Sequence, residues 1–465
     1  MSSIMVAGTS SSAGKSVIVA ALCRILSKRG YSVAPFKAQN MSLNSYVTKN
    51  GKEIAIAQAY QALAAGIEPD ERMNPILLKP KGNFRSQLVV LGEAVKDVSI
   101  KEYYGELEWL KKVVEDAYKS LKEEFDVVVV EGAGGFAEIN LFEKDLANIF
   151  TARIAKPKII IAADIERGGA FASLYGTYSL LPEDVRKLVV GFIINKMRGD
   201  KSLLNSGIAE LERLTGTKCF GIIPHAGFNI FSEDSLSLEE WENDGVVGVL
   251  RLPRISNFTD FEKIREVVKI VNLKEDLNDL EALIIPGTKE TIRDLKEVKK
   301  FGMDEKIRRF AKNKPVIGIC GGFQILGKEI VDEGVEYGKA KVKGLGLIDA
   351  VTFFKEFKKR TVQVEKRVTR DVAILDKIKG EKVRGYEIHM GVTKAKNPVF
   401  EDDGGSSEDG LVWGTYLHGL FLNDNVRKAL YDYLGIIFKE ETDEFEKFVD
   451  IFEKSVDIER IIELI

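Results

Sequence analysis

A glycine-rich run near the N-terminus has the residue types and spacing of a phosphate-binding loop. The run GTSSSAGKS extends from Gly8 to Ser16, between an apolar strand-like segment and a helix-like segment. Small residues let backbone N–H groups close around phosphate oxygens, and the following helix adds its positive dipole. Lys15 can reach the β- and γ-phosphates, and the Ser16 hydroxyl can bind Mg²⁺. Although five residues instead of four separate Gly8 from Gly14, the strand–helix context predicts a nucleotide site.

Polar residues at the ends of later strand-like runs could complete this site. Lys37 could neutralise the charge of a transferring phosphate, or simply end a strand at the surface. Glu131 ends a run of valines, where a carboxylate can hold Mg²⁺ near the γ-phosphate; Asp164 ends a strand similarly. Asn195 could read the nucleotide base, although Asn-Lys pairs are common in turns. The predicted ATP-binding residues are Gly8, Thr9, Gly14, Lys15, Ser16, Lys37 and Asn195, and the predicted Mg²⁺ ligands are Ser16 and Glu131.

A second reactive centre is predicted at Cys320. In KPVIGICGGFQILG this cysteine follows a strand-like run and is flanked by Gly318, Gly321 and Gly322. Glycines on both sides permit the sharp strand-to-helix turn of a nucleophile elbow, which exposes the side chain at a helix N-terminus. The helix dipole there favours the thiolate. We therefore predict that Cys320 is a nucleophile, and that the other two cysteines, which lie among apolar residues, are structural.

A thiolate nucleophile needs a proton carrier, and histidine is the usual one. The chain has only three histidines: His225, His389 and His418. His418, in GTYLHGLF, and His389, in GYEIHMG, are equal candidates on chemistry alone. His225 follows a proline in the first half of the chain, where a role in a turn or at a domain junction is expected.

The composition limits the class of protein. The 465 residues include 68 Lys and Arg against 71 Asp and Glu, a net charge of −3, so the basic excess typical of nucleic-acid binders is missing. Hydrophobic residues make up 45%, yet no apolar run approaches the ~18 residues of a membrane span. The N-terminus runs directly into the glycine motif, which leaves no room for a signal peptide. Three widely spaced cysteines suit a reducing compartment. We expect a cytoplasmic protein with neither a nucleic-acid nor a membrane partner.

Strand-like runs alternate with helix-like segments along most of the chain, which predicts an α/β protein with parallel sheets. The acidic, loop-like segment 225–245 interrupts this pattern and is the expected boundary. We predict an N-terminal P-loop parallel-sheet domain over 1–235 and a C-terminal α/β domain with the cysteine motif over 246–440. Residues 441–465 are expected to form a helical extension of the second domain.

Both motifs resemble those of known families. The long loop resembles that of dethiobiotin synthetase and its relatives; partition-type ATPases usually carry an extra lysine where this chain has Thr9, Ser10 and Ser11. The sequence GICGGFQILG resembles the nucleophile motif of class I glutamine amidotransferases, and GTYLHG then puts His418 in the position of the family's histidine. The glutamate expected two residues later is Leu420, so the standard triad is incomplete. Glu387 is a guess at its replacement.

Together the two halves resemble the cobyric acid synthases. The resemblance covers essentially the whole chain and includes the segments FKAQNMSLNSYVT, ADIERGGAFA, INKMRGD, LRLPRISNFTDF, PGTKET and YEIHMG. It departs at Ala55-Ile56, where the family usually has Gly-Arg. PGT at 286–288 matches the amidotransferase oxyanion strand.

The resemblance implies ATP and Mg²⁺ as cofactors, L-glutamine as nitrogen donor, and catalysis of its hydrolysis by Cys320 and His418. It implies a corrinoid substrate, adenosylcobyrinic acid a,c-diamide, amidated on its b, d, e and g carboxylates to give cobyric acid. Two alternatives stay open: a related amidoligase such as cobyrinic acid a,c-diamide synthase, and a P-loop nucleotide-switch scaffold. The oligomeric state also stays open.

Several polar residues keep two interpretations. Gln39, Asn40, Asn44 and the segment 79–87 are candidates to face the corrinoid, or they satisfy their own backbone. Glu53 is either a helix acid or a second metal ligand.

Overall fold

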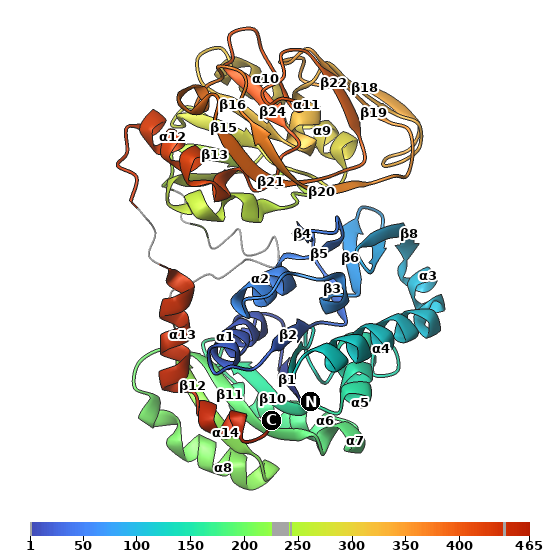
Figure 1. The fold of residues 1–465 in the computed structure, drawn as a ribbon, viewed down its shortest axis with the longest axis vertical. Helices are drawn as coiled ribbons and strands as arrows, with labels where there is room; N and C mark the ends of the chain where they lie inside the picture. The colour runs from blue at the N-terminus through green and yellow to red at the C-terminus, as the bar shows by residue number, and fades with distance from the viewer. Residues whose placement is uncertain (1, 226–240, 242–243, 440–442) are drawn as a thin grey trace.

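The chain folds into two α/β bodies that lie one above the other in Figure 1. The computed structural model describes residues 2–225, 241, 244–439 and 443–465. Each body is built on a six-stranded sheet of mainly parallel strands. The expected fold class, an N-terminal parallel-sheet domain followed by a second α/β domain, is confirmed. Most of the acidic segment expected at the boundary lies outside the described residues.

The first sheet has the strand order β12-β11-β10-β1-β9-β2, and all neighbours are parallel. Its strands are β1 (Ser2–Gly8), β2 (Val33–Phe36), β9 (Val127–Glu131), β10 (Lys158–Asp164), β11 (Val189–Met197) and β12 (Lys218–Pro224). On the central strand, Ile4 and Val6 join one apolar cluster while Met5 and Ala7 join another. Burial of both faces explains the continuous apolar runs of the sequence. The polar residues near the carboxyl ends of β9, β10 and β11 therefore lie at the same edge of the sheet as the end of β1.

Helices cover both faces of this sheet. Residues of α1 belong to the same apolar cluster as Ile4, and residues of α4 to the cluster of Met5. The helices of this body before the boundary are α1 (Lys15–Lys28), α2 (Ile56–Ala64), α3 (Ile100–Gly105), α4 (Leu107–Glu124), α5 (Thr151–Ala155), α6 (Ala170–Leu180), α7 (Glu183–Arg186) and α8 (Asn205–Thr215). In the described part of the whole chain, no helix is both long and apolar enough to cross a membrane.

Two small sheets lie between the first sheet and the second body (Figure 1). One has the order β3-β6-β7-β8 and the other is the hairpin β4-β5. Their strands are β3 (Gln39–Met41), β4 (Ser45–Val47), β5 (Glu53–Ala55), β6 (Ile76–Lys81), β7 (Arg85–Val90) and β8 (Glu93–Ser99). The hairpin contacts β20 and β21 of the second body. These strands were not predicted from the sequence, because none of them is a long apolar run.

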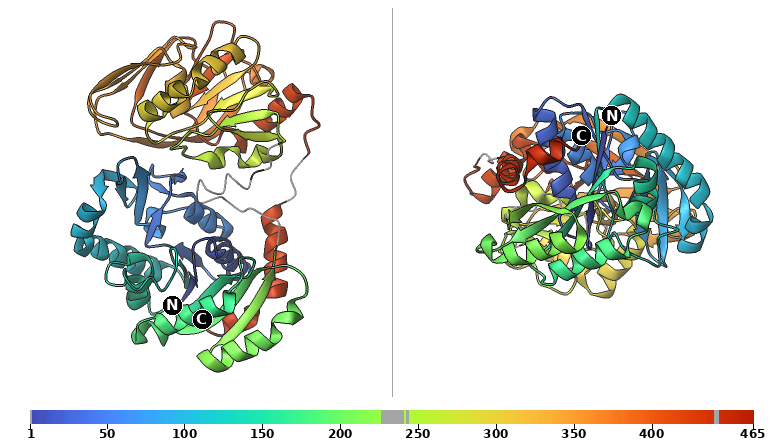
Figure 2. Two further views of the ribbon diagram at one scale, coloured as in Figure 1. Left: turned by 180° about the vertical axis from the view of Figure 1, so that it is seen from behind. Right: turned by 90° about the horizontal axis from the view of Figure 1, so that it is seen from below.

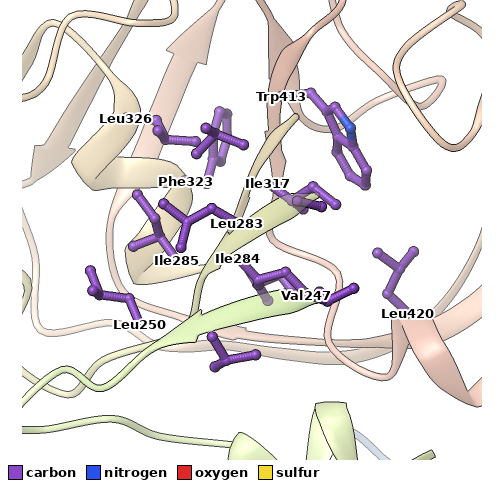
Figure 3. Close-up of a cluster of buried hydrophobic side chains, with 14 of the residues drawn as sticks. Val247, Leu250, Leu283, Ile284, Ile285, Ile317, Phe323, Leu326, Trp413 and Leu420 are labelled. Carbon is purple, nitrogen blue, oxygen red and sulfur yellow. The ribbon is translucent and has the colours of Figure 1, made fainter. Parts of the chain in front are cut away.

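The second body is built on a sheet of order β14-β13-β15-β16-β24-β23, in which only β23 runs antiparallel to its neighbour. Its strands are β13 (Val247–Leu250), β14 (Val268–Val271), β15 (Ala282–Ile285), β16 (Val316–Ile319), β23 (Gly405–Ser406) and β24 (Val412–Thr415). Figure 3 shows its apolar core, where Val247, Ile317 and Trp413 come together from three strands.

Further elements surround this sheet. The helices are α9 (Thr291–Lys300), α10 (Met303–Phe310), α11 (Gly321–Leu326) and α12 (Asp424–Leu434), with a 3₁₀ segment at Phe258–Val267. A four-stranded sheet and a hairpin use β17 (Glu329–Asp332), β18 (Ala340–Lys343), β19 (Ala350–Phe354), β20 (Arg360–Arg367), β21 (Lys382–His389) and β22 (Val392–Ala395).

The last two helices belong to the first body, so the expectation that 441–465 extends the second domain is wrong. α13 (Glu444–Ser455) and α14 (Ile458–Ile462) pack on α1 and β12 (Figures 1 and 2). Phe448 and Phe452 enter the apolar cluster of α1, and Glu446 pairs with Arg24 and Lys28 at its edge. The apolar stripe of α13 thus covers a part of the first sheet that α1 leaves open. An amphipathic pattern shows that a helix has a buried face, but not which body buries it.

We expect Phe452→Ala to destabilise the first body. Phe452 is fully buried in that cluster, and truncation of a buried phenylalanine costs about 3–5 kcal/mol. Hydrogen exchange followed by mass spectrometry should show faster exchange in α1 and β12, with β13–β16 unchanged. The matched control is Phe84→Ala, whose side chain is 99% exposed and whose loss should change stability by less than about 0.5 kcal/mol. Faster exchange confined to the second body would contradict this assignment.

Candidate active site

Cys320 follows β16 on a sharply turned backbone. Its φ and ψ are 51° and −106°, a conformation that costs a non-glycine residue about 1–3 kcal/mol and persists only when its surroundings enforce it. Its N–H donates to the Thr415 carbonyl on β24 at 2.8 Å. A Cβ atom on Gly322 would lie 1.9 Å from the Ile285 carbonyl oxygen. Gly322, in the first turn of α11, is therefore required by the close approach of this helix to the end of β15.

The Cys320 side chain is more enclosed than the elbow motif predicts. The residue is 8% exposed, and its thiol lies 3.5 Å from the Ile388 carbonyl oxygen at the end of β21. The other two cysteines lie in surroundings that are typical of unreactive, structural cysteines. Cys23 is fully buried, and burial raises the pKa of the Cys219 thiol to about 11.

His418 links Cys320 to a buried carboxylate. The imidazole lies close enough to Cys320 for that side chain to affect the pKa of His418, and its Nδ1 lies 2.7 Å from Oδ2 of Asp260. The other oxygen of Asp260 accepts the Gly419 N–H at 2.8 Å. Burial disfavours the imidazolium, but the Asp260 carboxylate and the Cys320 side chain outweigh it and raise the pKa of His418 to about 10. The three side chains form a Cys–His–Asp series.

Asp260 was missed by the sequence analysis, and the guess at Glu387 is wrong. Glu387 pairs with Lys366 at 2.6 Å and with Arg360, and it lies 3.6 Å from His389. Leu420, where the usual glutamate would stand, is fully buried in the apolar core (Figure 3). Asp260 lies 158 residues from His418 in sequence, so the only signal was its place in the quoted segment LRLPRISNFTDF.

His389, the other candidate proton carrier, faces elsewhere. Its ring stacks on Tyr416 at 3.7 Å, and its Nδ1 lies 2.7 Å from the Gly391 carbonyl oxygen. A cavity of about 640 Å³ is lined by Lys359, Arg360, His389 and Met390 among others. His389 lines this cavity and directly follows Ile388, whose carbonyl oxygen lies 3.5 Å from the Cys320 thiol.

The predicted oxyanion strand lies against the cysteine turn. A Cβ atom on Gly321 would lie 3.0 Å from the backbone nitrogen of Thr288, and one on Gly287 would lie 3.2 Å from Cε1 of His418. Backbone N–H groups held beside a nucleophile can stabilise an oxyanion. The PGT segment therefore has the position that the resemblance implies.

The glycine-rich run forms a loop between β1 and α1, as predicted. The Lys15 ammonium group donates to the carbonyl oxygens of Ser10 and Gly134, each at 2.9 Å. The Gly8 and Thr9 backbones are held by Phe136 and by the Ala162 carbonyl. Gly14 has a φ of 93°, in the left-handed region that glycine adopts most readily.

Glu131 is the centre of a buried polar cluster beside this loop. Its Oε1 accepts from the Ser16 hydroxyl and the Lys37 ammonium, each at 2.8 Å. Its Oε2 accepts from the amides of Gln58 and Gln61. Burial alone would raise the pKa of this carboxyl, but Lys37 and the hydrogen bonds from Gln61 and Ser16 hold the pKa below its ordinary value. An ionised carboxylate thus lies against the P-loop serine.

The remaining predicted residues lie at the same edge. The Asn195 amide donates to the Ala13 carbonyl at 3.0 Å, so in this structure it holds the loop backbone. Asp164 pairs with Lys196 at 2.9 Å. Within the described residues, no group of three or more His, Cys, Asp and Glu side chains could hold a metal ion. Mg²⁺ commonly binds one or two protein oxygens together with phosphates and waters, and the Ser16–Glu131 oxygen pair fits that type of site.

Comparisons with known proteins agree with this geometry. Residues 4–228 match the model of the CobQ/CobB/MinD/ParA nucleotide binding domain, and residues 246–426 match that of the CobB/CobQ-like glutamine amidotransferase domain. A probable cobyric acid synthase of Archaeoglobus fulgidus is 63% identical over 98% of this chain and 99% of its own. The chain belongs to the cobyric acid synthase family. Its members are enzymes, glutamine-dependent amidoligases.

Other members of the cobyric acid synthase family are also similar over their full length. Probable cobyric acid synthases of Methanosarcina mazei and Methanosarcina acetivorans are 53% and 52% identical, each over 99% of both chains. A solved glutamine amidotransferase covers 41% of this chain and all of its own at 21% identity, with a TM-score of 0.29; at that score it adds no argument.

In this member of the cobyric acid synthase family, Glu53 lies on a strand and not in a helix, and it belongs to no possible metal-binding group among the described residues. It lies on β5, fully buried, and pairs with Lys79 at 2.6 Å and with Lys359 of the second body. Burial opposes its ionisation, but the two lysines outweigh it and lower its pKa. Glu53 therefore joins the two bodies.

The polar residues proposed to face a corrinoid are mostly engaged within the protein. The Asn40 amide donates to Gln58 at 3.0 Å, and Gln39 accepts from the Tyr103 hydroxyl. Gln87 accepts from Lys289 of the second body at 2.7 Å. The backbone nitrogen of Gly82 donates to Glu290 at 2.9 Å. These four contacts fit the other interpretation of these residues, in which they satisfy polar groups of the protein itself.

We expect Asp260→Asn to lower kcat for glutamine hydrolysis by about 10²–10⁴-fold, because an amide cannot stabilise the imidazolium. The pKa of His418 should fall from about 10, so the alkaline limb of the kcat/KM profile should move to lower pH. The control is Asp332→Asn, another buried carboxylate of this body, which accepts only backbone N–H groups of residues 334–337. Equal losses in the two variants would contradict a specific role.

The Asp260–His418 pair should also affect the free energy of unfolding in a defined pH range. Since the folded pKa of His418 is raised from 6.5 to about 10, its contribution is full below pH 6.5 and is lost as the pH rises through about 10. Denaturant titrations should show the stability difference between the wild-type protein and Asp260→Asn shrinking over that window.

Proposed function

We propose that this enzyme uses ATP and glutamine to amidate the b, d, e and g carboxylates of adenosylcobyrinic acid a,c-diamide, giving cobyric acid. The observation that carries the proposal is the Cys320–His418–Asp260 series in the same chain as the P-loop carboxylate Glu131. The names of the full-length relatives support the choice of substrate. We also infer a cytoplasmic location, where ATP and reduced thiols are available.

In the second body, the Cys320 thiolate attacks the side-chain carbonyl of glutamine. Backbone N–H groups near Thr288 stabilise the resulting oxyanion. The His418 imidazolium, held by Asp260, gives its proton to the leaving nitrogen, and ammonia departs as the thioester forms. Water then hydrolyses the thioester to glutamate and frees the thiolate.

In the first body, the P-loop binds ATP and a substrate carboxylate attacks its γ-phosphorus. Lys15 and Lys37 neutralise charge that develops on the transferring phosphoryl group. Ser16 and Glu131 are the residues that would hold Mg²⁺, which neutralises phosphate charge when bound. The bond from the γ-phosphorus to the bridging oxygen breaks, and ADP leaves with that oxygen. Asn195 supports the loop through Ala13.

Ammonia from the second body then attacks the acyl phosphate. Its nitrogen forms a bond to the acyl carbon, inorganic phosphate leaves, and the nitrogen loses a proton to give the amide. Activation is required because a free carboxylate is a poor electrophile. The second body thus supplies ammonia, the first body supplies the acyl phosphate, and the two combine to form each amide bond.

We expect Glu131→Gln to raise the Mg²⁺ concentration needed for half-maximal ATP consumption by at least about 10-fold. The amide is a weaker Mg²⁺ ligand and leaves Lys37 without its carboxylate partner. Phosphate release measured against added MgCl₂ tests this. Asp164→Asn is the matched control, because it also removes a carboxylate that ends a strand and pairs with a lysine. If both variants shift the Mg²⁺ dependence equally, Glu131 is not the ligand.

We expect Cys320→Ala to abolish glutamine use while ammonium chloride still supports amidation. Mass spectrometry of the corrinoid, incubated with ATP and each nitrogen source, measures both activities. The wild-type enzyme should add four amide groups to the a,c-diamide. A product amidated only on the a and c positions of cobyrinic acid would favour the diamide synthase alternative. A slow rate of ATP hydrolysis that does not change when the corrinoid is added would favour the nucleotide-switch alternative.

A further inference from the structure

A buried segment of the first body holds the backbone just before Asp260. The Asn44 side-chain oxygen accepts the Phe258 N–H at 3.0 Å, and the Ser45 N–H donates to the Asn257 side chain at 3.0 Å. The Asn257 N–H donates to the Leu43 carbonyl at 3.4 Å. Asn44 is fully buried and Asn257 is 3% exposed. Three hydrogen bonds between the bodies therefore converge on residues 257–258.

The position of Asp260 depends on this junction. Its N–H donates to the Asn257 carbonyl at 3.0 Å, at the start of the 3₁₀ segment. Asn257 has a φ of 53°, in the left-handed region that asparagine tolerates better than most residues. Asp260 in turn contacts His418 and Gly419. A shift of residues 257–258 would move the carboxylate away from the imidazole.

The same first-body segment reaches the nucleotide site. Glu131 accepts from Gln58 at 3.1 Å, and Gln58 accepts from Asn40 at 3.0 Å. From Asn40 the chain runs through Ser42, whose N–H bonds the Leu78 carbonyl and whose hydroxyl oxygen accepts the Asn44 N–H. One stretch, residues 40–45, in which Asn40, Asn44 and Ser45 are buried, thus contacts both the support of Glu131 and the support of Asp260.

The other side of His418 also rests on a surface that the first body covers. The Tyr386 ring stacks on His418 with centroids 5.4 Å apart, and the Tyr46 ring lies 6.1 Å from that of Tyr386. The Gln363 amide, on the neighbouring strand, donates to the Val47 carbonyl at 2.8 Å. The β4–β5 hairpin is therefore packed on β21, the strand that carries Tyr386, whose ring stacks on the His418 imidazole.

We propose that Asn44 is a positioning residue of the glutaminase centre, supplied by the nucleotide-binding body: it fixes Asp260 against His418 and couples glutamine hydrolysis to occupation of the P-loop site. The inference rests on the proposed function, since it requires glutamine hydrolysis at Cys320. A ligand that shifts residues 40–45 changes the geometry of Asp260 through contacts already present. Coupling between sites is typically 5–150-fold.

The test is glutamate release by the full-length enzyme, with and without ATP, Mg²⁺ and the a,c-diamide. Asn44→Ala should lower kcat for glutamine by about 5–150-fold with little change in KM, because no glutamine contact is lost. It should also remove most of the stimulation by the first-body ligands. The alkaline limb of kcat/KM should move to lower pH, as in Asp260→Asn. Ammonia-dependent amidation should be retained.

Three further variants separate positioning from folding. Asn44→Asp keeps an accepting oxygen for the Phe258 N–H and should restore much of kcat. Asn74→Ala removes another buried asparagine of the first body, one that bonds only Lys37, Ala55 and Ile76 backbone groups, and should leave unstimulated glutamine hydrolysis unchanged. Asn44→Ala combined with Asp260→Asn should be no slower than Asp260→Asn alone, because both act through one carboxylate.

Two results would overturn the inference. One is a wild-type kcat and an unchanged pH profile in Asn44→Ala; the other is equal loss of glutamine-dependent and ammonia-dependent amidation, which indicates a purely structural role. Neither result bears on the proposed function, which fails instead if Cys320→Ala still hydrolyses glutamine.

Discussion

An ionised carboxylate that is removed from water must be surrounded by positive charge and hydrogen-bond donors, and this requirement organises the molecule. Three fully or almost fully buried carboxylates illustrate it. Glu131 is held by Lys37, Ser16 and two glutamine amides, and Asp260 by His418 and a backbone N–H. Glu53 is held by two lysines, one from each body. Losing one partner of such a group leaves a buried charge uncompensated, which costs several kcal/mol.

These three groups differ in what their partners do. Around Glu131 the donors come from one body and gather at the edge of the parallel sheet beside the glycine-rich loop. Around Asp260 the partner is His418, the proposed proton carrier, and the carboxylate raises the pKa of its imidazole. Around Glu53 the partners are one lysine from each body, and the ion pairs join the two bodies. The same physical requirement thus underlies two candidate sites and the contact between the bodies.

The local structure of the two candidate centres could be predicted from the sequence, because each is a contiguous strand–turn–helix unit. The P-loop and the turn at Cys320 are each formed by nine or ten consecutive residues, and both occur where expected. Prediction from the sequence failed where the contact joins distant segments. Asp260 reaches His418 across 158 residues, and no local pattern distinguishes it from other acids. The expected burial partner of α13 was wrong for the same reason: amphipathicity records a buried face and not the surface it meets.

The placement of α13 and α14 makes the second body an insertion within the first. The chain leaves the first sheet after β12, builds the entire amidotransferase-like body, and returns so that Phe448 and Phe452 can cover α1. During synthesis, the N-terminal segments therefore leave the ribosome before α13 exists, and the apolar surface of α1 and β12 that α13 covers is still exposed. The first body completes its core only when the last residues emerge. Along the chain, the segments of the second body are therefore complete before the residues that close the core of the first.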